Sequence, residues 1–435
     1  MWIGLLFSMI SLALLASEAP HDTDVSFYCQ KVIQCLAMGE YTRAGPYSLE
    51  TLIHYVHIEF SMHADAGGDL WYLLGLTVNL AMRAGYHRDP SNFTPNELSS
   101  VSLENEMRRR LWASVLLGDA LISSQMGMPC MISESQWDTR EPLNLDDDDL
   151  KDDREGNLAS HPSHPKAETV YTRVLSVIAG RRMAVVLGAI SAATNKPGLE
   201  HAEVVRLDKL LNGAGDSIPS VLKMKPMDMS ITDAPQVIMS RLFVSHMFLK
   251  GKLMLHRRYL FASPLGSGES RKACVSASLE VLDIQRILHE ETQPGGQLEP
   301  MRWRVSSIMN HQFLIATMIL SSALHRQVHV AQEERDSMRA ALRHSLMIWR
   351  KSMSVSREAA RAVQAIGAVL EYAEEHRLEQ GRKPRDQEGG SISAAGRFED
   401  WAMHMDGTIP DQEEVGSKFT HPLINIIEAD VKWYR

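Results

Sequence analysis

The sequence predicts an all-α fold, a large irregular multi-helix bundle, on three observations. Leu, Ala and Met dominate its apolar residues, with 24 Met among 435 residues, and all three favour helices. Apolar residues recur at helical spacing through long stretches, and no segment of useful length alternates as a half-buried strand does. With 44% hydrophobic and 23% charged residues, the chain can bury a large core. We therefore expect one helical domain over residues 1–378.

The apolar run 2–16 predicts the first helix, with Leu5, Met9, Leu12 and Ala16 on a buried face. A secretory signal is the alternative for residues 1–19. However, no Lys or Arg precedes Lys31, whereas a signal begins with a positive region. The run is too short to cross a membrane, and no other segment is expected to cross one.

Capping residues and glycines mark the ends of the next helices. Helices are predicted over residues 25–38 and 49–62, and Ser48 is a plausible N-cap of the second. The helix over residues 70–84 is apolar all round, as expected inside a bundle, with Asp69 at its start. Gly85 suits a left-handed cap at its end.

A long helix begins near Leu103 and continues to about residue 122, where Gly127 and Pro129 then stop it. Its first turns carry acidic residues four positions before basic ones, Glu104 before Arg108 and Glu106 before Arg110. The Arg108–Arg110 run is therefore interpreted as a salt-bridged helix face rather than a nuclear signal.

Residues 137–166 are acidic and carry Pro and His, which predicts a loop. The Asp146–Asp149 run does not fit an EF-hand, because Lys151 stands where that loop needs Gly. We expect a solvated turn that leads Leu150 back into the core. Further helices are predicted over residues 167–194, 201–211, 236–260, 270–289, 303–325 and 333–353, with residues 213–233 irregular.

Ser356 caps the last predicted helix, whose expected buried face comprises Ala359, Val363, Ile366, Leu370 and Ala373. Residues 379–397 are polar and Gly-rich, which predicts a flexible linker. Residues 398–435 are expected to form a C-terminal tail that is partly helical or loosely docked.

Charge and cysteine content exclude several functions. The net charge of −9 carries no basic surplus for phosphate backbones, so no direct nucleic-acid contact is expected. A binuclear zinc cluster needs six closely spaced thiolates, whereas the chain has four scattered cysteines. These are Cys29, Cys35, Cys130 and Cys274, which are expected to be reduced and buried. We predict no metal or other cofactor in this chain.

Two histidine pairs leave a metal-dependent helical enzyme open as an alternative. His54 and His57 stand three residues apart on a predicted helix, and His161 and His164 lie in the loop. No HExxH, GxSxG or P-loop motif occurs. Glu50, near His54, lies in the first turn of the predicted helix, where its negative charge interacts favourably with the helix dipole. We therefore predict no catalytic residues.

Asp119 is the only charge in the apolar run 111–122. Burying an unpaired carboxylate costs several kcal/mol. We therefore expect Asp119 to pair with an arginine, either Arg109 or Arg88, in an architectural role.

A Gly-x-His-Arg-Asp-Pro turn at residues 85–90 is followed by a Glu-x-x-Arg-Arg-x-Trp segment at residues 106–112 and by Asp119 seven residues further on. This ordered set resembles the middle homology region of fungal binuclear zinc-cluster transcription factors. Met128 stands where that family usually has Arg, and residues 137–138 and 142–144 are similar to its Asp and Pro-x-Asn loop. Weaker similarities follow at residues 253–260, 311–320 and 356–362. The matched positions are Gly85, His87, Arg88, Asp89, Pro90, Glu106, Arg109, Arg110, Trp112, Asp119, Gly127 and Pro129.

The resemblance implies an all-α regulatory module of a nuclear transcription regulator, with these positions in structural roles. Such a module would change conformation in response to a co-regulator or a small-molecule effector, and a homodimer is a further expectation. In the family a zinc cluster precedes this region and supplies DNA binding and zinc. The chain is thus expected to be a regulator without that cluster, or a fragment of a DNA-binding activator. A secreted helical protein, in which residues 1–19 are a signal sequence, remains a third alternative.

Overall fold

The computed structural model describes residues 1–17, 22–43, 45–65, 67–93, 103–150, 164–196, 198–260, 268–326 and 331–380. Helices and short 3-10 turns make up its regular structure, and no strand occurs in these ranges, which confirms the all-α prediction. The chain folds as two compact units. Among the described residues, the first comprises Met1–Leu255 and Thr292–Ile308, and the second comprises His256–Glu291 and residues 309–380.

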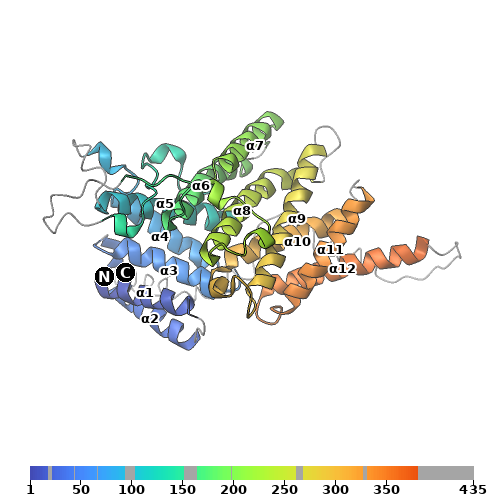
Figure 1. The fold of residues 1–435 in the computed structure, drawn as a ribbon, viewed down its shortest axis with the longest axis horizontal. Coiled ribbons are helices and arrows are strands. Elements are labelled where there is room, and N and C mark those ends of the chain that lie inside the picture. Colours follow the sequence, from blue (N-terminus) through green and yellow to red (C-terminus); the bar gives the residue numbers. More distant parts are fainter. Residues whose placement is uncertain are drawn as a thin grey trace, which may run out of the picture. The chain divides into compact units, whose positions relative to one another are not determined.

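In the described residues, the first unit is built from the eight consecutive α-helices α1 to α8. In Figure 1 the three N-terminal helices pack side by side. The helices are α1 (Trp2–Leu15), α2 (Asp22–Met38), α3 (Ser48–Met62), α4 (Asp69–Arg83), α5 (Leu103–Gln125), α6 (Arg173–Thr194), α7 (His201–Asp216) and α8 (Pro235–His256), the last of which ends at the unit boundary. Short 3-10 turns join them, namely η1 (Tyr41–Arg43), η2 (Pro90–Asn92), η4 (Glu134–Gln136), η5 (Asp147–Asp149), η7 (Ser220–Leu222), η8 (Met227–Met229) and η10 (Glu299–Arg304).

One apolar core holds the first unit together. Side chains from α2 to α6 and from α8 meet in it, and Trp112 of α5 is fully buried. Burial of these apolar side chains is the main favourable contribution to the folding free energy of the unit. The core also includes Leu52, Tyr55, Leu74, Leu187 and Val244.

The second unit contains η9 (Arg257–Tyr259), α9 (Gly268–Glu291), α11 (Gln332–Arg350) and α12 (Arg357–Gln380), with α10 (Ser307–His325) from Met309 onward. Helix α11 packs against both α9 and α12. A buried hydrogen bond from Ser345 Oγ to Gln285 Oε1 (2.8 Å) joins α11 to α9. Ser356 Oγ accepts from the Ala359 amide at 2.9 Å, so the predicted cap of the last helix is confirmed.

Helix α1 forms as predicted, but its expected buried face is wrong. Gly4, Ser8 and Ser11 are the buried residues, whereas Met9 is 54% exposed. The reason is close packing against α2 and α3, which only small side chains permit. A Cβ at Gly4 would lie 2.9 Å from Cys35 Cβ.

Several predicted boundaries move for identifiable reasons. Helix α6 begins at Arg173 rather than residue 167, because Thr172 caps it by accepting from the Leu175 amide (3.2 Å). Helix α7 continues to Asp216 through a segment predicted to be irregular. Ser48 is the first residue of α3 rather than its cap, a position that Tyr47 occupies with φ +66°. Most of the predicted linker and the whole tail lie outside the described residues.

Two helices, α6 and α10, are long and apolar enough to cross a membrane by length and composition alone. This was not expected from the sequence. In the folded chain, 67% of the most apolar window of α6 and 72% of that of α10 is buried. That extent of burial is typical of core helices.

Candidate functional site

A polar network in the first unit gathers most of the family-signature residues. It begins at the end of α4, where Gly85 has φ +78°. The Gly85 amide donates to Met82 O (2.9 Å) and the Tyr86 amide to Ala81 O (3.0 Å), which is the paired bonding of a Schellman motif. Glycine adopts this left-handed conformation without the Cβ clash, as predicted. The turn aims the following residues at α5.

The carboxylate of Asp89 is the centre of the network. Arg109 of α5 donates to it through Nε and Nη2, each at 3.0 Å, and both side chains are buried. The Arg140 amide (2.8 Å) and the amide and hydroxyl of Ser91 also donate to it. These bonds favour the charged form and hold the pKa of Asp89 well below its usual value, although burial alone would raise it.

Asp138 fastens a second segment to the same turn. Its carboxylate accepts from the Asp89 amide (2.8 Å) and pairs with Arg88 (2.9 Å) at the surface. The Asp138 amide donates to the carbonyl of His87 (3.0 Å). Pro90 is buried and opens η2, where it needs no amide hydrogen. Residues 137–150, which we call the signature loop, are thereby tied to the end of α4.

Glu106 and Arg110 of α5 hold the middle of the signature loop. They form the predicted i,i+4 pair at 3.1 Å, and Glu106 Oε1 also accepts from the Leu143 amide (3.0 Å). Arg110 reaches Leu145 O (2.9 Å) and Asp147 (2.8 Å). Burial raises the pKa of Glu106 despite these donors. Arg108 donates to Ala84 O (3.2 Å) and its guanidinium stacks on the Tyr86 ring. It does not form the predicted i,i+4 pair with Glu104.

Asp119 does not pair with Arg109 or Arg88, so that prediction is wrong. Its carboxylate accepts from the amides of Met131 (3.0 Å) and Ile132 (2.8 Å) and from Ser123 Oγ (2.9 Å). Gly127, with φ +65°, and the following Pro129 turn the chain so that these two amides face α5. Backbone donors replace the expected arginine, and burial raises the pKa of Asp119 above its ordinary value.

Asn144 closes the far end of the signature loop. Its side-chain amide donates to the carbonyls of Lys166, Ala167 and Val170, at 3.1 to 3.2 Å, and its oxygen accepts from Thr172. The expected acidic turn is present, and Leu150 after it is buried. Lys166 Nζ lies 2.7 Å from both Asp146 and Asp149. One side chain therefore orders the segment that leads into α6.

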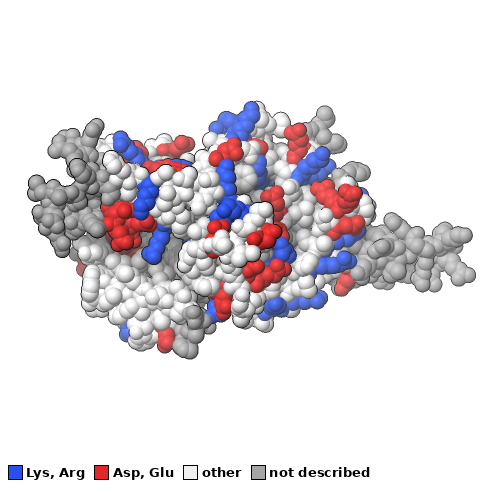
Figure 2. Space-filling view, in the orientation of Figure 1, with Lys and Arg blue, Asp and Glu red and all other residues white. Residues whose placement is uncertain are grey.

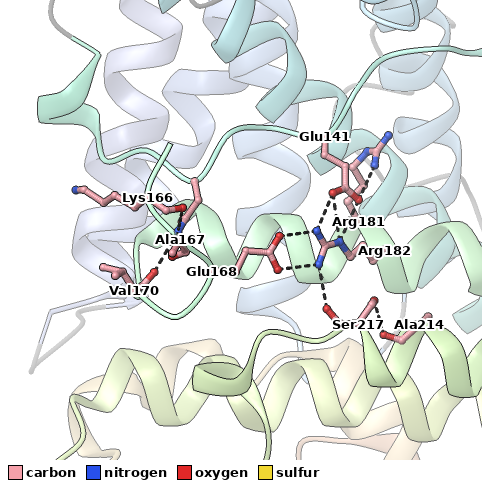
Figure 3. A network of polar contacts seen from close by, with 10 residues as sticks. Glu141, Lys166, Ala167, Glu168, Val170, Arg181, Arg182, Ala214 and Ser217 are labelled. Carbon is pink, nitrogen blue, oxygen red and sulfur yellow. Dashed lines mark hydrogen bonds and ion pairs between the residues drawn. The ribbon is translucent and has the colours of Figure 1, made fainter. Parts of the chain in front are cut away.

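Arg181 and Arg182 of α6 complete the network, and nothing in the sequence analysis singled them out. Figure 3 shows Arg182 between two carboxylates, with 2.9 Å to Glu141 and 2.7 Å to Glu168. It also donates to Ser217 O (3.0 Å), just beyond α7. Arg181 binds Glu141 (3.1 Å) and Thr139 O (2.8 Å). The available signal was two adjacent arginines inside an otherwise apolar helix.

The aromatic part of the signature lies beside the ion pairs. Trp112 is fully buried, with ring centroids 6.2 Å from His87 and 6.5 Å from Trp137. The guanidinium of Arg181 lies over the Trp137 ring at 5.1 Å. Such a cation–π contact strengthens when it is shielded from water. The signature residues thus combine a charged layer with an aromatic one.

The histidine and cysteine candidates are not assembled for chemistry. His54 Nδ1 lies 3.0 Å from Ser8 Oγ, and His57 packs against the rings of Phe60 and Trp303. Burial, with the charge of Arg304, lowers the pKa of His57 to about 4, and that same charge would repel a metal ion. Within the described ranges, no three His, Cys, Asp or Glu side chains are grouped as metal ligands. His161 lies outside these ranges.

The four cysteines are free thiols in the described structure. Burial raises the pKa values of Cys29, Cys130 and Cys274 to about 12. Since the thiolate is the nucleophile, these thiols are inert at neutral pH. The fold and the network together define a helical scaffold whose charged residues bind one another.

Comparison with known proteins shows which proteins the chain resembles. Residues 3–185 match the fungal specific transcription factor domain. The chain is 38% identical over 393 residues to the Zn(2)-C6 fungal-type transcription factor pigI of Monascus ruber, covering 86% of this chain and 47% of pigI. It is 37% identical to the fusarisetin A cluster transcription factor fsa6 of a Fusarium species, covering 85% and 51%. It is 36% identical to the equisetin cluster transcription factor eqxF of Fusarium heterosporum, covering 85% and 55%.

These matches confirm the resemblance seen in the sequence: the chain is similar to fungal Zn(2)-C6 transcription factors along most of its length. Transcription factors are not enzymes, so the non-enzymatic prediction is also confirmed. The chain spans about half the length of the curated relatives it matches. No solved structure matches it.

Proposed function

We propose that this chain is the regulatory module of a nuclear transcription factor that controls a biosynthetic gene cluster. The observation that carries the proposal is similarity along 85% of the chain to factors named for such clusters, those of fusarisetin A and equisetin. The similarity extends far beyond the domain match at residues 3–185 and includes the second unit.

Regulation would act by changing the conformation of the first unit in response to a co-regulator or a small-molecule effector. Such a ligand can shift an equilibrium only by binding two states with different affinity. The signature loop is the candidate two-state element, because side chains of α5 and α6 bind it through Glu106, Arg110, Arg181 and Arg182. Charge-assisted bonds of this kind are strong and directional, so releasing the loop would require breaking several of them.

DNA binding would be supplied outside these residues. A net charge of −9 and four scattered cysteines support this division of labour. We also propose that the module needs no metal or other cofactor. Sequencing the 5′ end of the transcript tests the first point, since an in-frame six-cysteine segment would make the chain part of a DNA-binding activator. Stoichiometric zinc in the purified chain, measured by mass spectrometry, would contradict the second.

A reporter assay tests the regulatory role. The chain is fused to a heterologous DNA-binding domain and expressed in a fungal host, and the reporter is compared with that domain alone. We expect the fusion to change reporter output and to accumulate in the nucleus. Unchanged output under all growth conditions, with the fusion present in the nucleus, would contradict the proposal.

A matched pair of variants tests the network itself. Glu141→Gln weakens the hold of Arg181 and Arg182 on the signature loop but keeps an accepting oxygen, and Glu141 is only partly buried. Glu203→Gln removes a comparable pair with Arg206 on the exposed surface of α7. We expect the first variant alone to shift reporter output. Equal output from both variants would remove the signature loop from the mechanism.

A further inference from the structure

Arg304 is held differently from the arginines of the polar network. It lies in η10, which belongs to the first unit, and its half-buried guanidinium stands over the ring of Trp303 at 5.7 Å. Among the described residues, this guanidinium has no hydrogen-bond acceptor and no carboxylate partner. Withdrawing a charge from water without a partner is costly, so an arginine placed in this way is a candidate for binding an external anion.

The electrostatic surroundings of Arg304 contain no opposing acid. Burial lowers the pKa of Arg304, and among the described residues only the phenol of Tyr171 acts in the other direction. The positive charge of Arg304 in turn lowers the pKa of His57, so the two groups are close enough to interact. Glu59, the acid of α3 nearest in sequence to His57, accepts from Cys29 Sγ (3.7 Å) instead. The site therefore lacks the negative charge that its arginine attracts.

Helix α3 and η10 supply an aromatic lining beside this charge. His57 and Phe60 stand three residues apart on α3 with ring centroids 4.6 Å apart, and the Trp303 ring lies 6.3 Å from that of His57. Ser307 Oγ donates to the Phe60 carbonyl (3.0 Å), and Ser307 O accepts from Gln125 of α5 (3.2 Å). These bonds hold the chain just after η10 against α3. Aromatic side chains around a few polar groups are typical of small-molecule sites.

The helices around His57 are poor in positive charge. Neither α1 nor α3 carries a Lys or Arg. Figure 2 shows a largely white surface over α1, α2 and α3, with few charged atoms. His54, which also acts on the pKa of His57, lies 3.0 Å from Ser8 Oγ of α1 through its Nδ1. A ligand bound at Arg304 would therefore meet no second cation on these two helices, and its remaining contacts would be apolar.

The charge balance of the site defines the class of ligand. The pKa of His57 is about 4, so at neutral pH its imidazole is uncharged and Arg304 alone supplies positive charge. One guanidinium balances one carboxylate, whereas a phosphate ester carries about 1.5 to 2 negative charges at neutral pH. The planar guanidinium also matches a carboxylate through two parallel hydrogen bonds. These properties favour a monoanionic acid with an apolar body.

We propose that Arg304 and His57 bind the carboxylate of a small aromatic acid. Neutral His57 has one N–H to donate, and the guanidinium donates the other hydrogen bonds. The rings of Phe60, Trp303 and Tyr171 would contact the apolar body of the acid. Assigning this acid as the effector of the module rests on the proposed function, whereas its binding does not.

Isothermal titration calorimetry of the purified full chain is the first test. The probes are 2-naphthoate, its uncharged amide 2-naphthamide, and acetate, which has the charge without the rings. We expect 2-naphthoate to bind at least tenfold more tightly than either of the others and than inorganic phosphate. Absence of saturable 2-naphthoate binding, or equal affinity for the amide or for phosphate, would overturn the proposal.

A matched pair of arginine variants tests the residue assignment. Arg304→Met removes the guanidinium, and Arg302→Met removes an exposed one from the same turn. We expect the affinity for 2-naphthoate to fall at least tenfold in the first variant and to change less than twofold in the second. Because no described residue pairs with Arg304, its removal should leave the melting temperature of the ligand-free protein unchanged or higher. Equal affinities, or a clearly lower melting temperature of Arg304→Met, would assign this arginine to the fold and overturn the proposal.

Hydrogen–deuterium exchange locates the bound probe. We expect 2-naphthoate to slow exchange in residues 57–60 and 299–307 and to leave α7 unchanged, and slowing confined to other residues would refute the site. Binding is measured on the purified chain, which separates this proposal from the regulatory one. An inactive reporter fusion with intact binding contradicts the proposed function alone, and an active fusion without binding contradicts this site alone.

Discussion

Arg109 and Asp89 are joined by two parallel hydrogen bonds of 3.0 Å inside the first unit, with side chains only 4% and 1% exposed. The two residues lie on different elements, the long helix α5 and the turn after α4. A paired buried charge adds little net stability compared with an apolar pair, but a buried charge left alone is very costly. The pair therefore fixes geometry more than it strengthens the fold.

Removing one partner of this pair should destabilise the protein strongly. Arg109→Met removes the guanidinium that is hydrogen-bonded to the buried Asp89 carboxylate, and we expect a loss of about 3–5 kcal/mol in the free energy of unfolding. Arg88→Met is the control, since Arg88 binds Asp138 at the surface, and it should cost no more than about 1 kcal/mol. Urea unfolding of both variants measures the difference. Equal losses would contradict the assignment.

The same pair predicts a response to acid. The pKa of Asp89 is lower in the folded state than the ordinary 3.8, so the unfolded chain binds more protons as pH falls through this range. The stabilisation is complete above about pH 4 and is lost as the pH falls toward the folded-state value. We therefore expect the difference in unfolding free energy between wild type and Asp89→Asn to shrink from pH 5 to pH 2. A constant difference would count against a charged Asp89.

Asp119 should tolerate amide substitution poorly, although no arginine contacts it in the described structure. The carboxylate accepts three hydrogen bonds on two oxygens, whereas an asparagine has one accepting oxygen and would turn a donor toward an amide hydrogen. We expect Asp119→Asn to cost about 1–3 kcal/mol in thermal or urea unfolding. Ser123→Ala, which removes only the hydroxyl donor, should cost less. The reverse order would show that the two backbone donors are dispensable.

Two helical glycines should respond to alanine in opposite directions. A Cβ at Gly251 of α8 would lie 2.8 and 2.9 Å from the methyl carbons of the buried Leu211, so Gly251→Ala should destabilise by about 1–3 kcal/mol. Gly213 of α7 has nothing within 4 Å of that position, and alanine there should stabilise by about 0.5–1 kcal/mol. Melting temperatures distinguish the two outcomes. A stabilised Gly251→Ala variant would mean that α7 and α8 can separate at little cost.

The lowered pKa of His57 in the folded state predicts a second loss of stability in mild acid. Its folded-state pKa is about 4 against an ordinary 6.5, so the unfolded state binds the additional proton between these values. Its contribution is complete above about pH 6.5 and disappears as the pH falls through 4. We expect wild type to lose on the order of 1 kcal/mol more than His57→Gln between pH 7 and pH 5. His344→Gln, on an exposed part of α11, should keep the wild-type profile.

Local signals in the sequence predicted local structure well. Gly85 is predictable as a C-terminal cap because the left-handed turn that ends a helix favours glycine. Ser356 is predictable as an N-cap because the first amides of a helix lack a backbone acceptor, which a serine hydroxyl can supply. The Glu106–Arg110 pair followed from helical spacing alone. These predictions depend only on residues within one turn of each other.

Long-range partners could not be predicted in the same way. The donors to Asp119 are backbone amides of Met131 and Ile132, and amides carry no sequence identity. The partner of Arg109 is Asp89, on another element, and helical spacing cannot reveal it. The prediction of which face of α1 is buried relies on side-chain polarity. In the structure α2 and α3 approach α1 so closely that only small side chains fit on the buried face, whatever their polarity.

The contacts of Asn144 bring together both ends of the chain stretch 151–163. The Lys166 amide donates to Asn144 O at 3.0 Å, and the Lys166 ammonium holds the acidic turn just before that stretch. Because described residues on both sides of this stretch contact one another, each doubling of its length would add a closure cost of only about 0.6 kcal/mol. This position is thus a natural place to insert an epitope tag or a fluorescent reporter.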